Sequence, residues 1–377
     1  ERERIDGTLL IWPGIAEELL GTKAWYARDG LFDGVDAVLF THVSNNLNVS
    51  WGDARGTGLI SVEYLFDGVA AHGAGDPWKG RSALDAVELM NVGWNFRREH
   101  LQPLQRSHYV ISNGGDQPNV VPSYASVWYF IREITAEGIR TNWDTLQRIA
   151  EGAAMMTDTT VSRRIVGAAW PRHFNKPIAL AMDENIRAVG LPTWSEDDQR
   201  FAKALQTLMG SDDPQGLATE LSDIGEPLEN PVSGGSDDIG DVSWNVPTVT
   251  LRYPSNVRGL QGHHWSSAMA MATPITHKGA TAGAKVVGAT MLDLLQDESL
   301  VAEAHAYFDD IQTKDVQYES FVGPDDDPAI EKNAETMALF KDQLEALYYD
   351  PARFDNYLDQ LGIEYPQIEA SFIQRGR

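Results

Sequence analysis

Two adjacent glutamates are the first residues of this 377-residue chain whose type and position suit hydrolytic chemistry. Glu17 and Glu18 follow the apolar run at 7–12, which predicts a buried strand. Neighbouring side chains of an extended backbone point to opposite sides, so one carboxylate can hold a metal ion while the other takes a proton from water. A carboxylate pair is also typical of a solvated loop or of the first turn of a helix. The pair alone leaves both interpretations open.

Three histidines, His42, His72 and His277, stand at the boundaries of predicted elements, near carboxylates or glycines. His42 follows a predicted strand at 37–41, and His277 opens a helix behind Pro274. Because strand ends meet at one edge of a sheet, where ligands gather, His42 and the glutamate pair are expected at the same edge. A single histidine is more often structural, so His277 also fits as a plain residue at the start of a helix.

Composition narrows the partners and the possible metal ligands. The chain has no cysteine, which leaves His, Asp and Glu as ligands. Its net charge of −25 argues against nucleic acid or an anionic membrane as partner. No stretch approaches the ~20 apolar residues of a membrane span, and the first residues show no signal-peptide core. We therefore expect a cytoplasmic protein that acts on a small molecule.

The acidic residues are scattered along the whole chain instead of forming a tail. There are 55 acidic and 30 basic residues. This distribution is typical of adaptation to high salt, where short screening lengths make a large net charge tolerable. An ordinary acidic cytosolic protein is the alternative. The sequence thus predicts a halophilic protein.

The middle of the chain has the most legible pattern of secondary structure. Apolar residues alternate or repeat at helical spacing in the order strand, helix, strand, strand, helix, strand. This order is typical of the split-βαβ sandwich, in which both helices cover one face of the sheet. The predicted strands lie at 59–66, 107–112, 126–132 and 159–166, and the predicted helices at 82–100 and 142–156.

The flanking parts of the chain predict an α/β domain that the sandwich interrupts. Strands are expected at 37–41 and 248–253, and a long helix of small residues at 277–295. We therefore assign residues 1–55 and 173–377 to a discontinuous α/β domain. Residues 56–172 form the inserted α+β domain.

Several stretches of the chain resemble one enzyme family, in that family's order. They include GTLLIWPGIAEELLGTKAWYARDGLFDGVDAVLFTHV, HYVISNGGDQPNVVPSYASVWYFIRE and ITHKGATAGAKVVGATMLDLL. The resemblance is to the dinuclear-metal amidohydrolases of the aminoacylase and carboxypeptidase superfamily. It implies a metallopeptidase-type catalytic domain with a mixed sheet, and an inserted ferredoxin-like domain that serves as lid and dimer interface.

The resemblance also implies roles for individual residues. Glu17 looks like the general base that activates water, and Glu18 looks like a metal ligand. Glu18 and His277 would share one divalent ion, and His42 would bind another; the ions would be Zn or Mn, one or two per subunit.

Residues of the inserted domain and of one further motif complete the implied site. His72 and Asn119 would reach the scissile carbonyl, often from the partner subunit, as hydrogen-bond donors to an oxyanion. His264 and Trp265 match a motif that contacts substrate, with a buried tryptophan beside a packed histidine as the alternative.

One departure from the family affects the predicted activity. The family takes two further metal ligands from a segment upstream of the paired glutamates, and nothing here matches that segment. We expect either that an N-terminal part is missing from this polypeptide or that the site is incomplete. The predicted function is metal-dependent hydrolysis of an amide bond in an N-acyl or aminobenzoyl amino acid, by a homodimer with a possible second homologous subunit. The alternative is a non-catalytic homologue or partner subunit that retains the fold.

Overall fold

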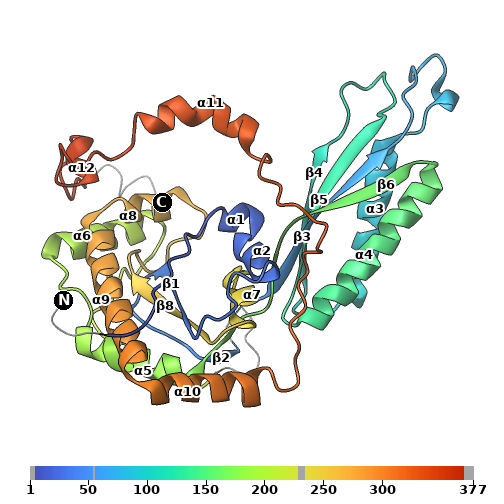
Figure 1. Ribbon diagram of the computed structural model, residues 1–377. Helices are drawn as coiled ribbons and strands as arrows, with labels where there is room; N and C mark the ends of the chain where they lie inside the picture. Colours follow the sequence, from blue (N-terminus) through green and yellow to red (C-terminus); the bar gives the residue numbers. More distant parts are fainter. Residues whose placement is uncertain (1–4, 54–55, 228–233, 369–377) are drawn as a thin grey trace.

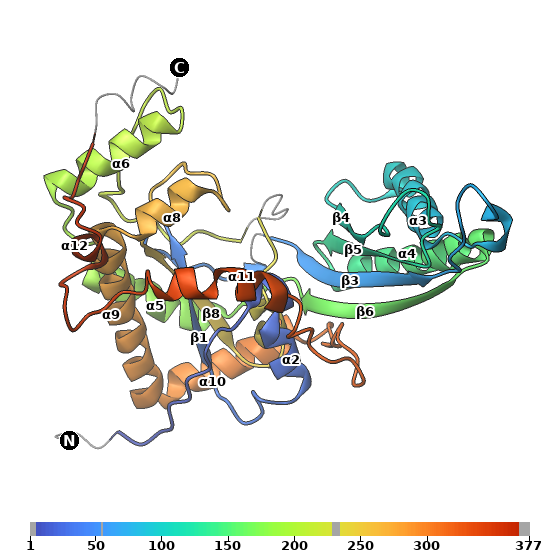
Figure 2. The same ribbon diagram turned by 90° about the horizontal axis from the view of Figure 1, so that it is seen from above.

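The computed structural model describes residues 5–53, 56–227 and 234–368, which form a larger and a smaller lobe (Figure 1). The smaller lobe is a four-stranded antiparallel sheet with the order β4-β5-β3-β6. Figure 2 shows its helices together on one side of the sheet. Its elements are β3 (Gly58–Asp67), α3 (Ala83–Arg97), β4 (Arg106–Asn113), β5 (Tyr124–Glu133), α4 (Ala136–Thr157) and β6 (Thr160–Ala169). The predicted βαββαβ sandwich is confirmed, with the strand order of a ferredoxin-like fold.

Side-chain alternation explains how this lobe folds. In β5, Val127, Tyr129 and Ile131 are fully buried against the helices, and each contributes roughly 1.5–3 kcal/mol by leaving water. The buried Tyr129 hydroxyl donates to Asn91 at 2.5 Å, so its polar end is satisfied. Thr135 caps α4 by accepting from the Gly138 amide. This cap starts α4 earlier than the predicted helix at 142–156.

The larger lobe is built around a parallel pair of strands, β1 (Val38–Ser44) and β8 (Thr248–Pro254). Apolar residues of α5 (Lys176–Val189) and α9 (Pro274–Gln296), among them Ile178, Met182 and Val286, pack against Val249 and Leu251 of β8. The predicted α/β character is confirmed, since mixed helices and strands make up this lobe. The carboxyl ends of both strands lie at one edge, where a site is expected.

The remaining elements surround this pair or connect it to the sandwich. They are α1 (Glu17–Leu20), α2 (Thr22–Arg28), β2 (Gly52–Asp53), η1 (Pro77–Lys79), η2 (Arg98–His100), β7 (His173–Phe174), α6 (Glu196–Leu208), α7 (Ile239–Ser243), α8 (Trp265–Met271), α10 (Glu298–Tyr307), η3 (Phe308–Gln312), α11 (Ala334–Glu345) and α12 (Tyr357–Gln360). No helix in the described ranges combines the length and the apolar character that a membrane crossing requires.

The buried strand predicted at 7–12 is wrong. These residues have no regular structure, and Ile11 is 80% exposed. Within the described residues, no strand pairs with this run, because β1 pairs with β8 alone. Apolar content without a hydrogen-bonding partner does not make a strand. Consequently Glu17 and Glu18 do not follow an extended backbone but sit on the short helix α1.

Candidate functional site

The helix α1 turns its two glutamates towards different surroundings. Successive residues of a helix differ by about 100° in direction. Glu17 is partly buried and faces Asp237 and Asp238, whereas the Glu18 side chain is 78% exposed, with its Oε2 3.9 Å from Nε2 of His263. The expected separation of the two carboxylates therefore holds, although a helix and not a strand produces it.

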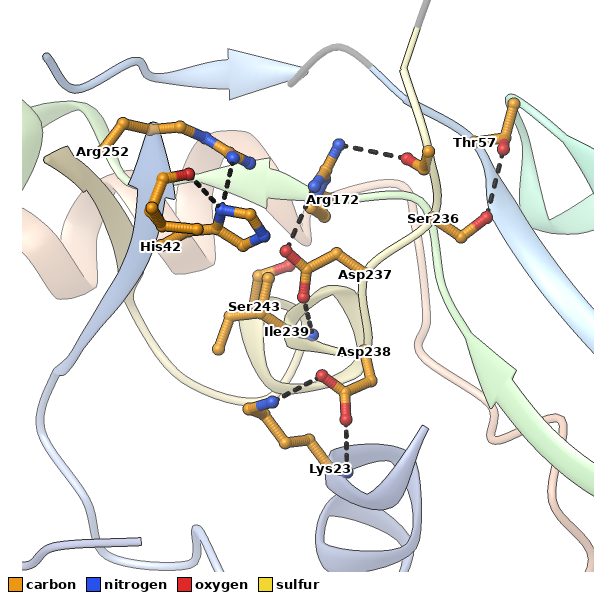
Figure 3. A network of polar contacts seen from close by, with 12 residues as sticks. Lys23, His42, Thr57, Arg172, Ser236, Asp237, Asp238, Ile239, Ser243 and Arg252 are labelled. Carbon is orange, nitrogen blue, oxygen red and sulfur yellow. Dashed lines mark hydrogen bonds and ion pairs between the residues drawn. The ribbon is translucent and has the colours of Figure 1, made fainter. Parts of the chain in front are cut away.

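Three carboxylates form a compact cluster around Glu17. Possible ligand atoms of Glu17, Asp237 and Asp238 lie within 4.8 Å of one another. Figure 3 shows Lys23 bound to Asp238, at 2.6 Å, and Arg172 facing Asp237, at 3.3 Å. Burial, and next the negative charges of Asp238 and Asp237, raise the pKa of Glu17 to about 7. A carboxylate with a pKa near neutrality is well suited to accept a proton from water.

The cluster opens on a small cavity of about 60 Å³ between α1 and the sandwich sheet. Arg132, at the end of β5, lines the cavity together with Glu17 and Glu18. Its Nη1 donates to Ser236 at 3.0 Å, but its buried Nε has no hydrogen-bond partner in the described part of the chain. Burial lowers the pKa of Arg132, and the two glutamates oppose this effect. A desolvated guanidinium with a free donor is suited to bind a carboxylate group.

Sequence reasoning missed Arg132 and the aspartate pair. Trp128, Phe130 and Arg132 alternate along β5 on the face away from the helices, and this period-2 pattern was the available signal. Asp237 and Asp238 lie in a polar, glycine-rich region that predicts only a loop.

His42 lies near the carboxyl end of β1, in register with Arg252 of β8. Its Nδ1 is 2.7 Å from the Val43 carbonyl and 2.9 Å from Nη1 of Arg252. Figure 3 shows the ring pointing towards Arg172 and Asp237. Burial, and next the charge of Arg252, lower the pKa of His42, so the ring is neutral at pH 7. The tautomer that donates from Nδ1 to Val43 leaves the Nε2 lone pair free for a metal ion, which fits the predicted role.

His277 lies on the first turn of α9, at the same edge of the β1–β8 pair. A side chain at Gly279 would come within 2.0 Å of the Pro254 carbonyl, so only glycine lets α9 begin this close to the end of β8. Thr276 donates to the Ser255 carbonyl at 2.8 Å and fixes that contact. His277 itself is exposed, and its ring is available.

The structure does not gather the predicted metal ligands into one group. Among the described residues, Glu17, Asp237 and Asp238 are the one set of three possible ligands that close together. Glu18, His42 and His277 offer the donor types that a divalent ion such as Zn or Mn takes, and their roles remain predictions.

His72 and Asn119 come together, but far from Glu17. The backbone amide of Gly73 donates to the Asn119 carbonyl at 2.7 Å. Nδ1 of His72 accepts from the amide of Gly75 at 3.0 Å, so Nε2 carries the proton and can donate. Both residues lie in loops beyond the outer end of β3, whose 10 residues span roughly 30 Å. Within one chain these two residues cannot share a site with Glu17.

His264 and Trp265 lie at the start of α8. Nδ1 of His264 caps the helix by accepting from the Ser266 amide at 3.3 Å. Trp265 is 53% exposed, so the alternative of a buried tryptophan is wrong and a substrate contact stays a prediction. The neighbouring His263, which the sequence reasoning missed, is the histidine that approaches Glu18. Its left-handed backbone, with φ of 53°, directs it there.

The sandwich corresponds to a known family. Residues 56–155, from the start of β3 to the last turns of α4, match the M20 peptidase dimerisation domain. Over 320 residues, 79% of the chain, it is 34% identical to one of the subunits of p-aminobenzoyl-glutamate hydrolase of Escherichia coli (strain K12). The chain belongs to the M20 family. The resemblance predicted from the sequence is confirmed.

Other M20-type relatives match shorter parts of the chain. Xaa-Arg dipeptidase of Mus musculus is 30% identical over 183 residues, 48% of the chain. A crystal structure of an aminobenzoyl-glutamate utilization protein from Klebsiella pneumoniae covers 71% of the chain and 56% of its own, with a TM-score of 0.46 and 18% identity. The chain spans 66% of the length of the E. coli hydrolase polypeptide and 42% of the dipeptidase.

Proposed function

We propose that this protein hydrolyses an amide bond in a small N-acyl or aminobenzoyl amino acid, with a divalent metal ion as cofactor. The observation that carries the proposal is Glu17: a partly buried carboxylate, with its pKa raised to about 7, beside a cavity that it shares with Arg132. The named hydrolases among the relatives support the same reaction.

Each residue has a definite task in this proposal. Glu18, His42 and His277 hold Zn or Mn, which when bound polarises the amide carbonyl and acidifies water. Glu17 accepts the proton of the attacking water and passes it to the leaving amine.

Substrate recognition falls to residues on both sides of α1. The guanidinium of Arg132 binds the carboxylate of the amino-acid part of the substrate. His264 and Trp265 contact the acyl part, for which the exposed indole offers an apolar surface.

The proposal includes a homodimer, because His72 and Asn119 act on the site of the second copy. The roughly 30 Å length of β3 keeps them away from Glu17 of their own chain. The edge strand β4, with Val110 58% and Ile111 43% exposed, is the surface proposed for self-association. Because the E. coli relative is named as one subunit of a hydrolase, a second homologous subunit is a further possible partner.

A second candidate function is a non-catalytic homologue or partner subunit. It is favoured by the placement of Glu18, His42 and His277 outside the one close group of possible ligands, and by the ion pairs of Asp237 and Asp238.

Substrate assays separate the two candidates. The purified protein, supplied with Zn or Mn, is tested on p-aminobenzoyl-glutamate and on dipeptides. Arg132→Gln should raise KM at least tenfold, whereas Arg132→Lys, which keeps the charge, should raise it less. If no amide is cleaved with saturating metal and any second subunit present, the non-catalytic candidate is the better one.

A further inference from the structure

The C-terminal part of the chain crosses from the larger lobe to the sandwich as an extended segment, Tyr318–Lys332, which we name the strap (Figures 1 and 2). Its first residues join the apolar core of the sandwich: Phe321 is 3% and Val322 is 2% exposed. The ring of Phe321 stacks on Trp170 at 5.6 Å. The strap is therefore anchored where β6 leaves the sandwich.

The middle of the strap lies against the helices that carry the glutamates. Arg28 of α2 donates to the carbonyls of Gly323, at 2.9 Å, and Asp326, at 2.7 Å. Ala329 is 2% exposed and packs with Leu20 of α1 and Val166 of β6. One strap residue thus covers the contact between α1 and the sandwich.

The contact between α1 and β6 is an unusually close approach of two backbones. A Cβ atom at Gly167 would lie 2.5 Å from the Leu20 carbonyl oxygen, and one at Gly21 would lie 2.5 Å from the Ala168 carbonyl oxygen. With no side chains between them, α1 depends on what presses it from outside. Among the described residues that packing comes from Ala329, together with Leu19 and Trp128.

The end of the strap is held on the open face of the sandwich sheet by Glu63, which is 6% exposed. Lys332 donates to Oε2 of Glu63 at 3.0 Å and its ammonium lies 4.3 Å from the Trp128 ring centre. Arg164 bridges Glu63 and Glu331. Burial raises the pKa of Glu63, but the hydrogen bonds from Ser112 and Lys332 outweigh it, so the carboxylate stays ionised.

We infer that the strap clamps α1 onto the sandwich and so fixes Glu17 with respect to Arg132, with Ala329 and Lys332 as positioning residues. Glu17 stands on α1 and Arg132 on β5, and both line one cavity. The ion pair of Lys332 with Glu63 closes the clamp, and Ala329 transmits its pressure to Leu20. The catalytic meaning of this arrangement rests on the proposed function, but the clamp itself does not.

Opening of the clamp is measurable without any activity. The chain has no cysteine, so an Ala329→Cys variant carries a single, buried thiol whose reaction with a maleimide reports exposure of the strap. Adding Lys332→Met, which keeps the aliphatic stem but removes the charge, should accelerate labelling about tenfold. Lys332→Arg should restore slow labelling. Lys341→Met, whose side chain is 67% exposed on α11, is the matched control and should change nothing.

Hydrogen exchange then separates a clamp from a local stabilising contact. In Lys332→Met without the cysteine, amide exchange should accelerate severalfold both in the strap and at 18–21 of α1. If the strap opens while α1 keeps its protection, or if neither changes, the inference is wrong. Given an amide substrate, the same variant should lower kcat and leave KM within about twofold; inactivity of every form would instead count against the proposed function alone.

Discussion

Glu17 of α1 and Asp238, which directly precedes α7, approach within 4.8 Å although more than two hundred residues separate them in the chain. Lys23 binds Asp238 and thereby neutralises one of the two charges. Glu17 has no such partner of its own and lies partly buried. The arrangement keeps one carboxylate ionised and makes the ionisation of the other costly, which separates their pKa values.

Neutralising Glu17 should stabilise the protein at high pH. Its folded-state pKa of about 7 is raised above its ordinary value of 4.5, so its stabilising contribution is complete below about pH 4.5 and is lost as the pH rises through 7. Relative to the parent, Glu17→Gln should gain on the order of 1–3 kcal/mol between pH 5 and pH 9. Thermal unfolding with a chelator present measures this. A constant difference across that range would contradict the raised pKa.

The two adjacent glutamates should fail in different ways when they are changed. Glu17→Gln cannot accept a proton and should lose ~10² to 10⁴ in kcat with metal content intact. Glu18→Gln replaces a carboxylate by a poorer amide ligand and should lose metal first. Metal stoichiometry and amide hydrolysis are measured for both variants. A fully active Glu17→Gln, or a Glu18→Gln that keeps its metal, would refute the division of roles.

The sequence predicted the sandwich well because its signals are local. Alternation in β5 and the helical repeat in α4 arise within single elements. The surroundings of Glu17 depend instead on Asp237 and Asp238, which approach it only through the packing of α2 on α7. The apolar run at 7–12 failed for a related reason, since a strand needs a partner that its own residues do not specify.

Changing Asp241 should alter the pH dependence of stability. This fully buried carboxylate accepts from the Trp170 amide at 2.9 Å and from the Tyr318 hydroxyl at 2.8 Å. Burial raises its pKa to about 7, and Asp238 adds to this. The raised pKa means that stability falls as the pH rises from about 3.8 through 7. Asp241→Asn should lack this part of the fall.

The control for that experiment is Asp67→Asn, at the exposed end of β3. Unfolding temperatures of the parent and both variants are compared between pH 4 and pH 8, where only Asp241→Asn should flatten the curve. Equal slopes for the parent and Asp241→Asn would show that this carboxylate does not titrate in the window.

The excess of negative charge predicts that salt stabilises the protein. Repulsion within a net charge of −25 reaches over ~10 Å at 0.1 M salt and is screened within a few ångströms at multimolar salt. The unfolding temperature should therefore rise steadily with KCl over this range. Sucrose at matched viscosity is the control for effects unrelated to charge. An unchanged midpoint would contradict adaptation to high salt.

Mixing two inactive variants tests whether the sandwich completes the site of a second copy. His72→Ala and Glu17→Gln should each be nearly inactive as homodimers. If His72 acts in trans, a mixed dimer has one site with both residues intact, so random exchange of subunits should restore about a quarter of the parent rate. If His72 acts in cis, no site in any mixture is intact and nothing is restored. The structure favours restoration, because His72 lies beyond the outer end of β3 while Glu17 lies on α1, near its start. Glu17→Gln mixed with Glu18→Gln is the control, since both residues stand on one helix and their mixture should restore no activity.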